Sequence, residues 1–506
     1  MKSSDLYALV CFVGAMSSAT RWLRVAQREH YLPFSTSRFA IRWWTVGILN
    51  PVLACVALAA AVWGLWIAPL CVITAVAVCG GPRGLTLRGT TSPLVWTRRL
   101  RTVGVTSLFF VAIISLLCRQ LGFGPTACAV VALAMPAIVD VILFILKPIE
   151  DRLARRYVVE AAETLDRVNP IRIAVTGSYG KTTIKGYIRH LLSETFSVVA
   201  SPASFNNSAG LSRSVNEHVA QSTEIFVAEM GAYSPGEIAE LVSWVKPSIS
   251  VLAAIGPVHL ERFGDLDTIV SSKSEIFATS RTAIVNVDAY GLSSEADRLQ
   301  VSGIDVVRCS AIDRTADVAV IKDHGGLEVM LSGRQIVAGL TIDAAPTNVA
   351  CAVAVSTALG ISEEVIARRL VDLPSAEHRR QVLVSQSGVT VIDDTYNSNP
   401  AGAAAALETL AEVETQRRAV VTPGMVELGH RQAAENRRFG VDASLVADDL
   451  IIVGQTNKSA LVSGSRDGNA RVHLMASRED AVRWVREHLD AGDAVLYEND
   501  LPDHYP

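Results

Sequence analysis

The first 147 residues contain very few acidic side chains. Up to Lys147 the sequence has 13 Lys and Arg but only three acids, Asp5, Glu29 and Asp140, so the whole-chain net charge of −4 leaves about −14 for the remainder. The basic residues lie between long apolar runs, where membrane topology explains them better than nucleic-acid binding does. We therefore expect a basic membrane region followed by an acidic, soluble part, and no nucleic-acid partner.

Cysteines with metal-ligand or redox spacing are also missing. Six of the eight lie in or beside the apolar runs, and Cys309 and Cys351 are isolated. Buried free thiols are therefore the expected state. We find no internal repeat, no low-complexity tract and no convincing signal-peptide cleavage site, so we do not expect a cleaved leader. A chain of 506 residues is too long for one compact core and suggests about three units.

Five apolar segments are each close to the roughly 17 to 25 residues that a transmembrane helix needs. They cover about 5–20, 43–61, 63–80, 103–119 and 124–146. Arginines fill the connections at 21–42 and 83–101, and the positive-inside rule places both in the cytoplasm. Five spans then put the N-terminus outside and everything after Lys147 inside. Asp140 lies within the last segment and is either functional or solvated near a helix end.

The pattern changes after the last apolar run. Residues 148–169 alternate charged and apolar side chains at helical spacing, which predicts an amphipathic connector. Beyond Asn169, short β-branched runs alternate with helical stretches, which is typical of parallel sheets covered by helices. A polar stretch near Pro374 suggests a boundary. The expected fold is a multi-span α-helical membrane region at 1–147, then α/β: a P-loop domain with a parallel sheet at 170–375 and a Rossmann-like domain at 376–506.

A strand, a glycine loop and a helix follow one another at residues 171–192. The run IRIAV leads into TGSYGKTT at 176–183 and then into IKGYIRHLLSET. Glycines let backbone N–H groups approach phosphates, and the helix N-terminus adds its dipole. In this context Lys181 would reach the β- and γ-phosphates and Thr182 would ligate Mg²⁺, so ATP and Mg²⁺ are the expected cofactors. A chance glycine-rich turn is the alternative, since Val175 stands where the full phosphate-loop pattern has its first glycine.

Five further motifs follow the phosphate loop in order. They are SFNNSAGLS at 204–212, EMGAYSPGEIAEL at 229–241, GPVHLERFGDLDTIVSSKSEIF at 256–277, TNVACAVAV around Asn348 and DDTYNSNPAGAAAALETL at 393–410. With these motifs the chain resembles the Mur ligase family, most of all the branch that adds D-alanyl-D-alanine to a muramoyl tripeptide. The resemblance is good over about 170–430 and looser over the last seventy residues. It implies an ATP-dependent ligase of cell-wall peptidoglycan synthesis that joins a carboxylate to an amino acid or dipeptide through an acyl phosphate, and the apolar runs add the expectation that this ligase is membrane-anchored.

The resemblance also implies a site. Glu229 and His259 would ligate Mg²⁺, and Lys273 would be carbamylated, which turns a cation into an anionic metal ligand. Without the resemblance Lys273 is a solvated surface lysine. Lys181, His259 and Lys273 are thus the candidate catalytic residues. The implied nucleotide contacts are Gly177, Ser178, Tyr179, Gly180, Lys181, Thr182, Thr183, Asn348, Asp394 and Arg379, with a solvated charge run at 377–380 as the alternative for the last. The implied substrate contacts are Asn206 and Asn207 for the carboxylate-bearing substrate and Tyr396, Asn397 and Asn399 for the incoming dipeptide.

The two ends of the chain depart from the family pattern. Ordinary Mur ligases begin with a small α/β domain that binds the UDP end of their substrate, whereas this chain has apolar runs there. The carboxylate substrate is therefore either a UDP compound bound in another way or a lipid-linked precursor. The ending GDAVLYENDLPDHYP leaves the acceptor amine open. A ligase that extends another membrane- or lipid-linked polymer, and a non-catalytic nucleotide-dependent membrane scaffold, are the alternatives; the complete metal and phosphate set argues against the scaffold.

Overall fold

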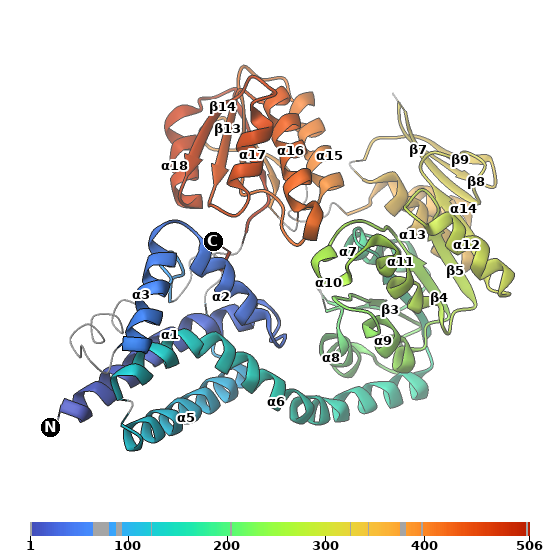
Figure 1. Cartoon of the computed structure of the whole chain (residues 1–506). Helices are drawn as coiled ribbons and strands as arrows, with labels where there is room; N and C mark the ends of the chain where they lie inside the picture. The colour runs from blue at the N-terminus through green and yellow to red at the C-terminus, as the bar shows by residue number, and fades with distance from the viewer. Residues whose placement is uncertain are drawn as a thin grey trace.

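The computed structural model describes residues 3–63, 80–87, 94–122, 124–202, 205–323, 325–342, 344–374, 381–395, 398–501 and 504–505. These residues form a helical region and two α/β parts, one on a nine-stranded sheet and one on a six-stranded sheet (Figure 1). The expected span at 63–80 lies almost entirely outside the described residues. The helical region consists of α1 (Ser3–Arg28), α2 (Ser35–Thr45), α3 (Leu49–Trp63), α5 (Arg98–Gln120) and α6 (Gly124–Val168).

The first expected connection is largely helical. α1 continues to Arg28, and within it Arg24 is fully buried while Arg21 donates to the Leu85 carbonyl oxygen at 3.0 Å. The expected span at 43–61 is divided between α2 and α3, which are bent by 109°. The bend follows from an extended Val46 and a left-handed Gly47 (φ +69°) after α2. The prediction that 43–61 is helical is therefore confirmed in part, but the prediction of one continuous helix is wrong.

α6 joins the helical region to the central part. It runs without a break through Pro136 and Pro148 to Val168, so the expected connector at 148–169 is the second half of one 45-residue helix. Figure 1 shows this helix reaching from the other helices to the green central part. Among the described residues, Arg98–Cys118 and Val130–Val168 are long and apolar enough to cross a membrane, and the bent pair α2 and α3 would make a third.

Asp140 has a structural role inside the helical region. Its side chain is buried and accepts hydrogen bonds from the backbone N–H of Thr36 at 3.3 Å and of Ser37 at 2.8 Å, and from the Thr36 hydroxyl. These two N–H groups belong to the first turn of α2, where helical donors have no partner within the helix. Asp140 therefore caps α2 from a neighbouring helix, with a charge of the sign that a helix N-terminus favours.

The central sheet has the order β2-β3-β1-β4-β5-β6-β7-β8-β9. Its strands are parallel up to β7, as expected, and β8 and β9 add an antiparallel extension that we did not predict. Along β1, Ile173 and Val175 face one buried layer with α7, α13 and α14, while Ala174 faces the other with α8, α9, α12 and the end of α6. The strands are β1 Ile171–Thr176, β2 Val198–Ala200, β3 Ile225–Glu229, β4 Ile249–Leu252, β5 Thr282–Asn286, β6 Asp305–Ser310, β7 Val318–Asp323, β8 Gly326–Leu331 and β9 Arg334–Leu340; the helices are α7 Lys181–Leu192, α8 Ser208–His218, α9 Glu237–Val245, α10 Leu260–Phe263, α11 Leu266–Ser274, α12 Leu292–Val301, α13 Pro346–Ala358 and α14 Glu363–Val371.

The last sheet has the order β10-β11-β15-β12-β13-β14 and is parallel except for the edge strand β10. α15, α16 and α17 cover one face and α18 covers the other, which agrees with a Rossmann-like arrangement. The strands are β10 Gln381–Val384, β11 Thr390–Asp394, β12 Arg418–Thr422, β13 Asp449–Val453, β14 Arg471–Met475 and β15 Ala494–Glu498; the helices are α15 Pro400–Glu412, α16 Gln432–Val446, α17 Lys458–Ser465 and α18 Arg478–His488.

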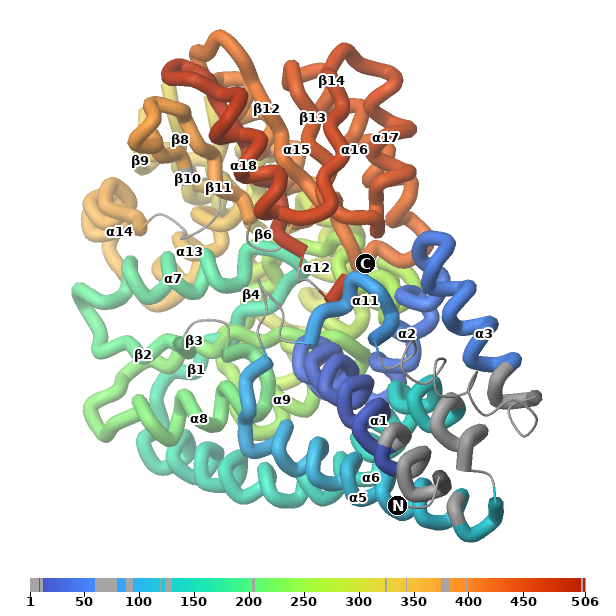
Figure 2. Tube along the Cα trace, turned by 90° about the vertical axis from the view of Figure 1, so that its left-hand side faces the viewer, coloured from blue at the N-terminus to red at the C-terminus, as the bar shows by residue number. Residues whose placement is uncertain are grey.

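The C-terminal tail returns to the helical region. Trp43 Nε1 on α2 donates to the His504 carbonyl oxygen at 2.8 Å, and His504 Nε2 lies 3.2 Å from Glu29 Oε1. Tyr505 packs edge-on against Phe39, with the ring centroids 4.9 Å apart. Figures 1 and 2 both place the C-terminus beside α2. The tail therefore ties the last α/β part to the region where the chain begins.

Candidate active site

The phosphate loop between β1 and α7 needs glycine at two positions. Gly177 and Gly180 have φ values of +154° and +80°, a region that side chains disfavour. A Cβ at Gly177 would lie 3.0 Å from the backbone nitrogen of Ala254, and one at Gly180 would lie 2.5 Å from Asn348 Oδ1. The backbone is therefore packed too closely for any other residue, as in a loop whose N–H groups must reach a phosphate.

Hydrogen bonds fix this loop between the ends of β3 and β4. Ser178 N donates to the Ala254 carbonyl oxygen at 2.8 Å, and the Ser178 hydroxyl accepts from Gly256 N at 3.0 Å. On the other side, the Thr176 hydroxyl donates to the Met230 carbonyl oxygen at 2.8 Å. Lys181 Nζ bends back over the loop and donates to the Gly177 carbonyl oxygen at 2.8 Å. The cation is thus held over the loop where phosphates would bind.

Glu229 lies at the end of β3 and is 1% exposed. Its Oε2 accepts hydrogen bonds from the Thr182 hydroxyl and from Lys185 Nζ, both at 2.9 Å, and its Oε1 accepts from Asn206 Nδ2 at 3.1 Å. The hydroxyl and carboxylate oxygens expected to hold Mg²⁺ are therefore adjacent. Lys185, which we did not predict for the site, places a positive charge against this carboxylate.

Lys273 is on α11 and is only 4% exposed, so the reading of a solvated surface lysine is wrong. Among the described residues its amine has neither a hydrogen-bond acceptor nor an ion-pair partner. Burial and then the neighbouring charge of Lys181 lower the pKa of the Lys273 amine to about 7, while Glu237 opposes the shift. A large fraction of this amine is therefore neutral at physiological pH.

His259, at the start of α10, links two parts of the chain. It has a left-handed backbone (φ +56°), and its Nδ1 is hydrogen-bonded to Glu427, which follows β12. Arg262 lies 3.8 Å from the same carboxylate. Burial opposes ionisation of Glu427, but the hydrogen bond and charge of His259 and the charge of Arg262 lower its pKa to about 2. The His259 ring also packs on Tyr233, at 4.6 Å between centroids.

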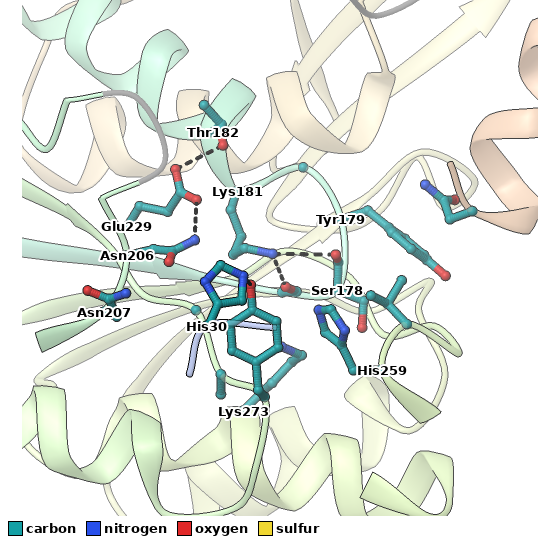
Figure 3. A pocket seen from close by; sticks show the side chains of 17 residues that line it. His30, Ser178, Tyr179, Lys181, Thr182, Asn206, Asn207, Glu229, His259 and Lys273 are labelled. Carbon is teal, nitrogen blue, oxygen red and sulfur yellow. Dashed lines mark hydrogen bonds between the residues drawn. The ribbon is translucent and has the colours of Figure 1, made fainter. Parts of the chain in front are cut away.

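Most of the predicted side chains meet at one cavity of about 220 Å³ (Figure 3). Thr183, Asn348 and Asp394 do not line it, although Asn348 contacts the phosphate loop. Arg379, Tyr396 and Asn397 lie outside the described residues. No group of three or more His, Cys, Asp and Glu side chains that could hold a metal occurs in the described parts of the chain, so an ion here would need oxygen ligands of other kinds. The predicted residues that line the cavity are Gly177, Ser178, Tyr179, Gly180, Lys181, Thr182, Asn206, Asn207, Glu229, His259, Lys273 and Asn399.

Two polar lining side chains, His30 and Tyr233, were not predicted. Tyr233 stands in the EMGAYSPGEIAEL motif, so its position after Glu229 was an available signal. His30 belongs to an arginine-rich connection between apolar runs, and no local pattern there marks a site. Glu498, at the end of β15, was not predicted either. Burial raises the pKa of its carboxyl group to about 7, although the hydrogen bonds that it accepts from Ser398 and Thr422 act to lower the pKa.

Comparison with known proteins agrees with this geometry. Residues 175–355 match the Mur ligase middle domain, and residues 378–497 match the Mur ligase, glutamate ligase domain. The UDP-N-acetylmuramoyl-tripeptide–D-alanyl-D-alanine ligase of Mycobacterium bovis is 33% identical over 358 residues, which are 64% of this chain and 69% of the relative. The chain belongs to the Mur ligase family. It is accordingly an ATP-dependent carboxylate–amine ligase that uses ATP and Mg²⁺, as the phosphate loop predicted.

Other Mur ligases extend the comparison. The D-alanyl-D-alanine-adding ligase of Bacillus subtilis is 25% identical, over 64% of this chain and 72% of its own. The solved structure of MurF from Thermotoga maritima in complex with ADP shares the fold, with a TM-score of 0.59 and 24% identity over 69% of this chain and 80% of that one. MurF from Acinetobacter baumannii gives a TM-score of 0.58 at 23% identity, over 69% and 77%. The family matches begin at residue 175, so His30 lies outside them.

Proposed function

We propose that this Mur ligase joins D-alanyl-D-alanine to the free carboxyl group of a muramoyl tripeptide, at the expense of ATP. One observation carries the proposal: the phosphate loop, Glu229, His259 and Lys273 line a single cavity, to which the last α/β part contributes Asn399. The named relatives support this choice of substrates, since those quoted above carry the name of the D-alanyl-D-alanine-adding ligase. The glycine-rich loop, the Lys181 cation and the Glu229 carboxylate together provide the groups that an enzyme needs to transfer a phosphoryl group to a substrate carboxylate.

The cavity suits both ATP and Mg²⁺. The close packing at Gly177 and Gly180 leaves room only for backbone, which is what a phosphate needs for access to the N–H groups of the loop. The Thr182 hydroxyl and the Glu229 carboxylate are oxygen ligands of the kind that Mg²⁺ prefers, and Lys273 would join them as a carbamate. When bound, Mg²⁺ would neutralise phosphate charge and so lower the barrier to phosphoryl transfer.

The reaction has two steps. A carboxylate oxygen of the tripeptide attacks the γ-phosphorus of ATP, the bond to ADP breaks, and an acyl phosphate forms. The amine of the dipeptide then attacks the acyl carbon, the C–O bond to phosphate breaks, and amide, phosphate and a proton are released. Lys181 stabilises charge on the transferred phosphoryl group, while Asn206 and Asn207 orient the carboxylate.

We also propose that the helical region anchors the ligase in the cell membrane with the α/β parts in the cytoplasm. The two span-length apolar helices, and the bent pair as a third, support anchoring. Large apolar side chains are exposed on them, among them Val105, Phe109 and Leu116 on α5 and Phe144 on α6, at 57% to 65%. Such side chains suit lipid better than water. The arginine-rich connection at 21–42 contacts the ligase, since Arg42 pairs with Glu261 at 2.6 Å, which agrees with both lying on one side.

The proposal is tested with the full chain purified in detergent. ATP and Mg²⁺ are supplied with UDP-N-acetylmuramoyl-tripeptide and a panel of amino acids and dipeptides, and phosphate release is followed together with the mass of the product. We expect phosphate release to depend on D-alanyl-D-alanine and to be lowered about 10²- to 10³-fold by Lys181→Ala, which removes a charge from the transferred phosphoryl group. Turnover with a different acceptor would overturn the substrate assignment, and normal turnover in the Lys181 variant would overturn the nucleotide site.

A further inference from the structure

The helical region contributes a side chain to the catalytic cavity. His30 lies on the loop between α1 and α2, yet it lines the same cavity as the phosphate loop and Lys273. Figure 3 shows its imidazole among the labelled side chains of that site. The two rings are 5.2 Å apart between centroids, and the Tyr233 hydroxyl lies 3.2 Å from His30 Nε2. The contact joins residues 203 positions apart in the chain.

The residues on either side of His30 hold the loop in place. Glu29 accepts from Arg262 at 3.0 Å and so attaches the loop to α10 of the central part. Tyr31 points back into the helical region, where its hydroxyl lies 3.1 Å from the Thr97 hydroxyl and its ring lies under Arg99 at 4.4 Å. His30 and Tyr31 both have left-handed backbones, with φ of +55° and +58°. Strained conformations of this kind persist only where surrounding contacts fix them, and they concentrate at functional sites.

His30 is also set up to donate a hydrogen bond. Burial, partly opposed by the charge of Glu29, lowers its pKa, so the ring is neutral at pH 7 and above and carries one proton. Nε2 is paired with the Tyr233 hydroxyl, and in the tautomer in which that hydroxyl donates, the ring proton is on Nδ1. Among the described residues Nδ1 has no hydrogen-bond partner. Lys181 lines the same cavity, so the N–H donor faces a site that also holds a cation for an anionic group.

We propose that His30 binds the carboxylate of the donor substrate, and the acyl phosphate formed from it, by a hydrogen bond from Nδ1–H. This assignment rests on the ligase function proposed above. The phosphate loop and the Asn348 that abuts it lie within the residues that match the Mur ligase middle domain, whereas His30 lies before them. Because His30 lies in the same cavity but outside the residues that match this domain, we assign it to the carboxylate substrate and not to the nucleotide. The helical region thereby helps the ligase to recognise its donor substrate, in addition to anchoring the ligase in the membrane.

Two substitutions of His30 distinguish the effect of its hydrogen bond from the effect of its aromatic ring. His30→Phe keeps the stacking on Tyr233 and removes the N–H, whereas His30→Asn puts an amide N–H close to the position of Nδ1 and tolerates a left-handed backbone. Tyr31→Phe is the matched control, because it changes the same loop on the side that faces away from the cavity. Each full-length variant is assayed in detergent with UDP-N-acetylmuramoyl-tripeptide, D-alanyl-D-alanine and ATP, after a thermal melt has confirmed that it is folded.

We expect His30→Phe to raise the KM for the tripeptide at least tenfold while the KM for ATP changes less than about twofold. His30→Asn should stay within about threefold of the wild type, and Tyr31→Phe should match it. The proposal is overturned if His30→Phe leaves the tripeptide KM within about twofold, if it raises the ATP KM in parallel, or if the Asn and Phe variants lose donor affinity equally. A wild-type protein without turnover would instead contradict the proposed function, and this assignment with it.

Discussion

At the residue scale, Lys273 combines three features that ordinary surface lysines lack: a buried position, a pKa lowered to about 7 and a neighbouring cation in Lys181. A free ammonium there would repel Mg²⁺, whereas a carbamate supplies a negative charge and oxygen ligands. Carbamylation consumes the neutral amine and CO₂. The neutral fraction of an amine with this pKa is about half at pH 7 and about a tenth at pH 6. Carbamate content should therefore decline on the acid side of pH 7.

Lys273→Ala should be nearly inactive and should recover activity with acetate, which returns a carboxylate to the space of the carbamate. Lys273→Arg should stay inactive, because it restores only positive charge. The carbamate itself is measured by NMR with ¹³C-bicarbonate, which should give a carbamate signal in the wild type at pH 8 that is lost in Lys273→Ala. An arginine variant as active as the wild type would show that no carbamate is needed.

Lys185 and Glu229 form a buried ion pair, with their side chains 6% and 2% exposed. Removing one partner of such a pair leaves an uncompensated buried charge, which costs about 3–5 kcal/mol. We expect Lys185→Met to lower the free energy of unfolding by about that amount. Lys246→Met is the control, because Lys246 pairs with Asp166 at a half-exposed site where such pairs contribute about 0–1 kcal/mol. Equal effects of the two substitutions, measured by denaturant unfolding of the detergent-purified protein, would contradict the role of Lys185.

At the element scale, α2 depends on a cap that belongs to another helix. Asp140→Ala would leave the N–H groups of Thr36 and Ser37 without their acceptor, and loss of a helix cap costs about 0.5–2 kcal/mol. The predicted result is a lower thermal midpoint. Asp151→Ala provides the comparison on the same helix, because Asp151 is exposed and, within the described parts of the chain, pairs with Lys147 alone, one turn away. If both variants melt like the wild type, Asp140 does not hold α2 in place.

The elements that could be predicted from the sequence are those whose signal is local. β1, the glycine loop and α7 are consecutive, so a β-branched run, two glycines and a helical pattern were sufficient to place Lys181 and Thr182. The break between α2 and α3 was missed because it depends on the backbone at Val46 and Gly47 inside an otherwise apolar run. The antiparallel strands β8 and β9 were missed because their pattern of side chains does not reveal strand direction.

At the scale of the whole molecule, the contacts that complete the site join distant parts of the chain. His30 meets Tyr233 across 203 positions, and His259 meets Glu427 across 168. Neither pair has a local pattern, so the sequence could predict His259 from its motif but not its partner, and could not predict His30 at all. These contacts, with the tail at His504 beside Glu29, bring the helical region and both α/β parts together at one cavity.

The membrane orientation gives a prediction of its own. Because the arginine-rich connection at 21–42 packs on the ligase, a reporter fused after Pro506 should be active in the cytoplasm, and one fused before Met1 should lie outside if the number of spans is odd. Alkaline phosphatase and green fluorescent protein fusions report the two sides. A C-terminal reporter on the outer side would contradict the proposed orientation and the access of the ligase to ATP.

The central claim is that the cavity converts a carboxylate into an acyl phosphate before an amide forms. It is tested most directly with UDP-N-acetylmuramoyl-tripeptide whose reacting carboxylate carries ¹⁸O in both positions, incubated with ATP, D-alanyl-D-alanine and the full-length protein. The reaction scheme transfers one carboxylate oxygen to phosphorus, so mass spectrometry should find one ¹⁸O in each phosphate released and one in each amide formed. Phosphate free of ¹⁸O would mean that ATP is hydrolysed by water, and would contradict the account.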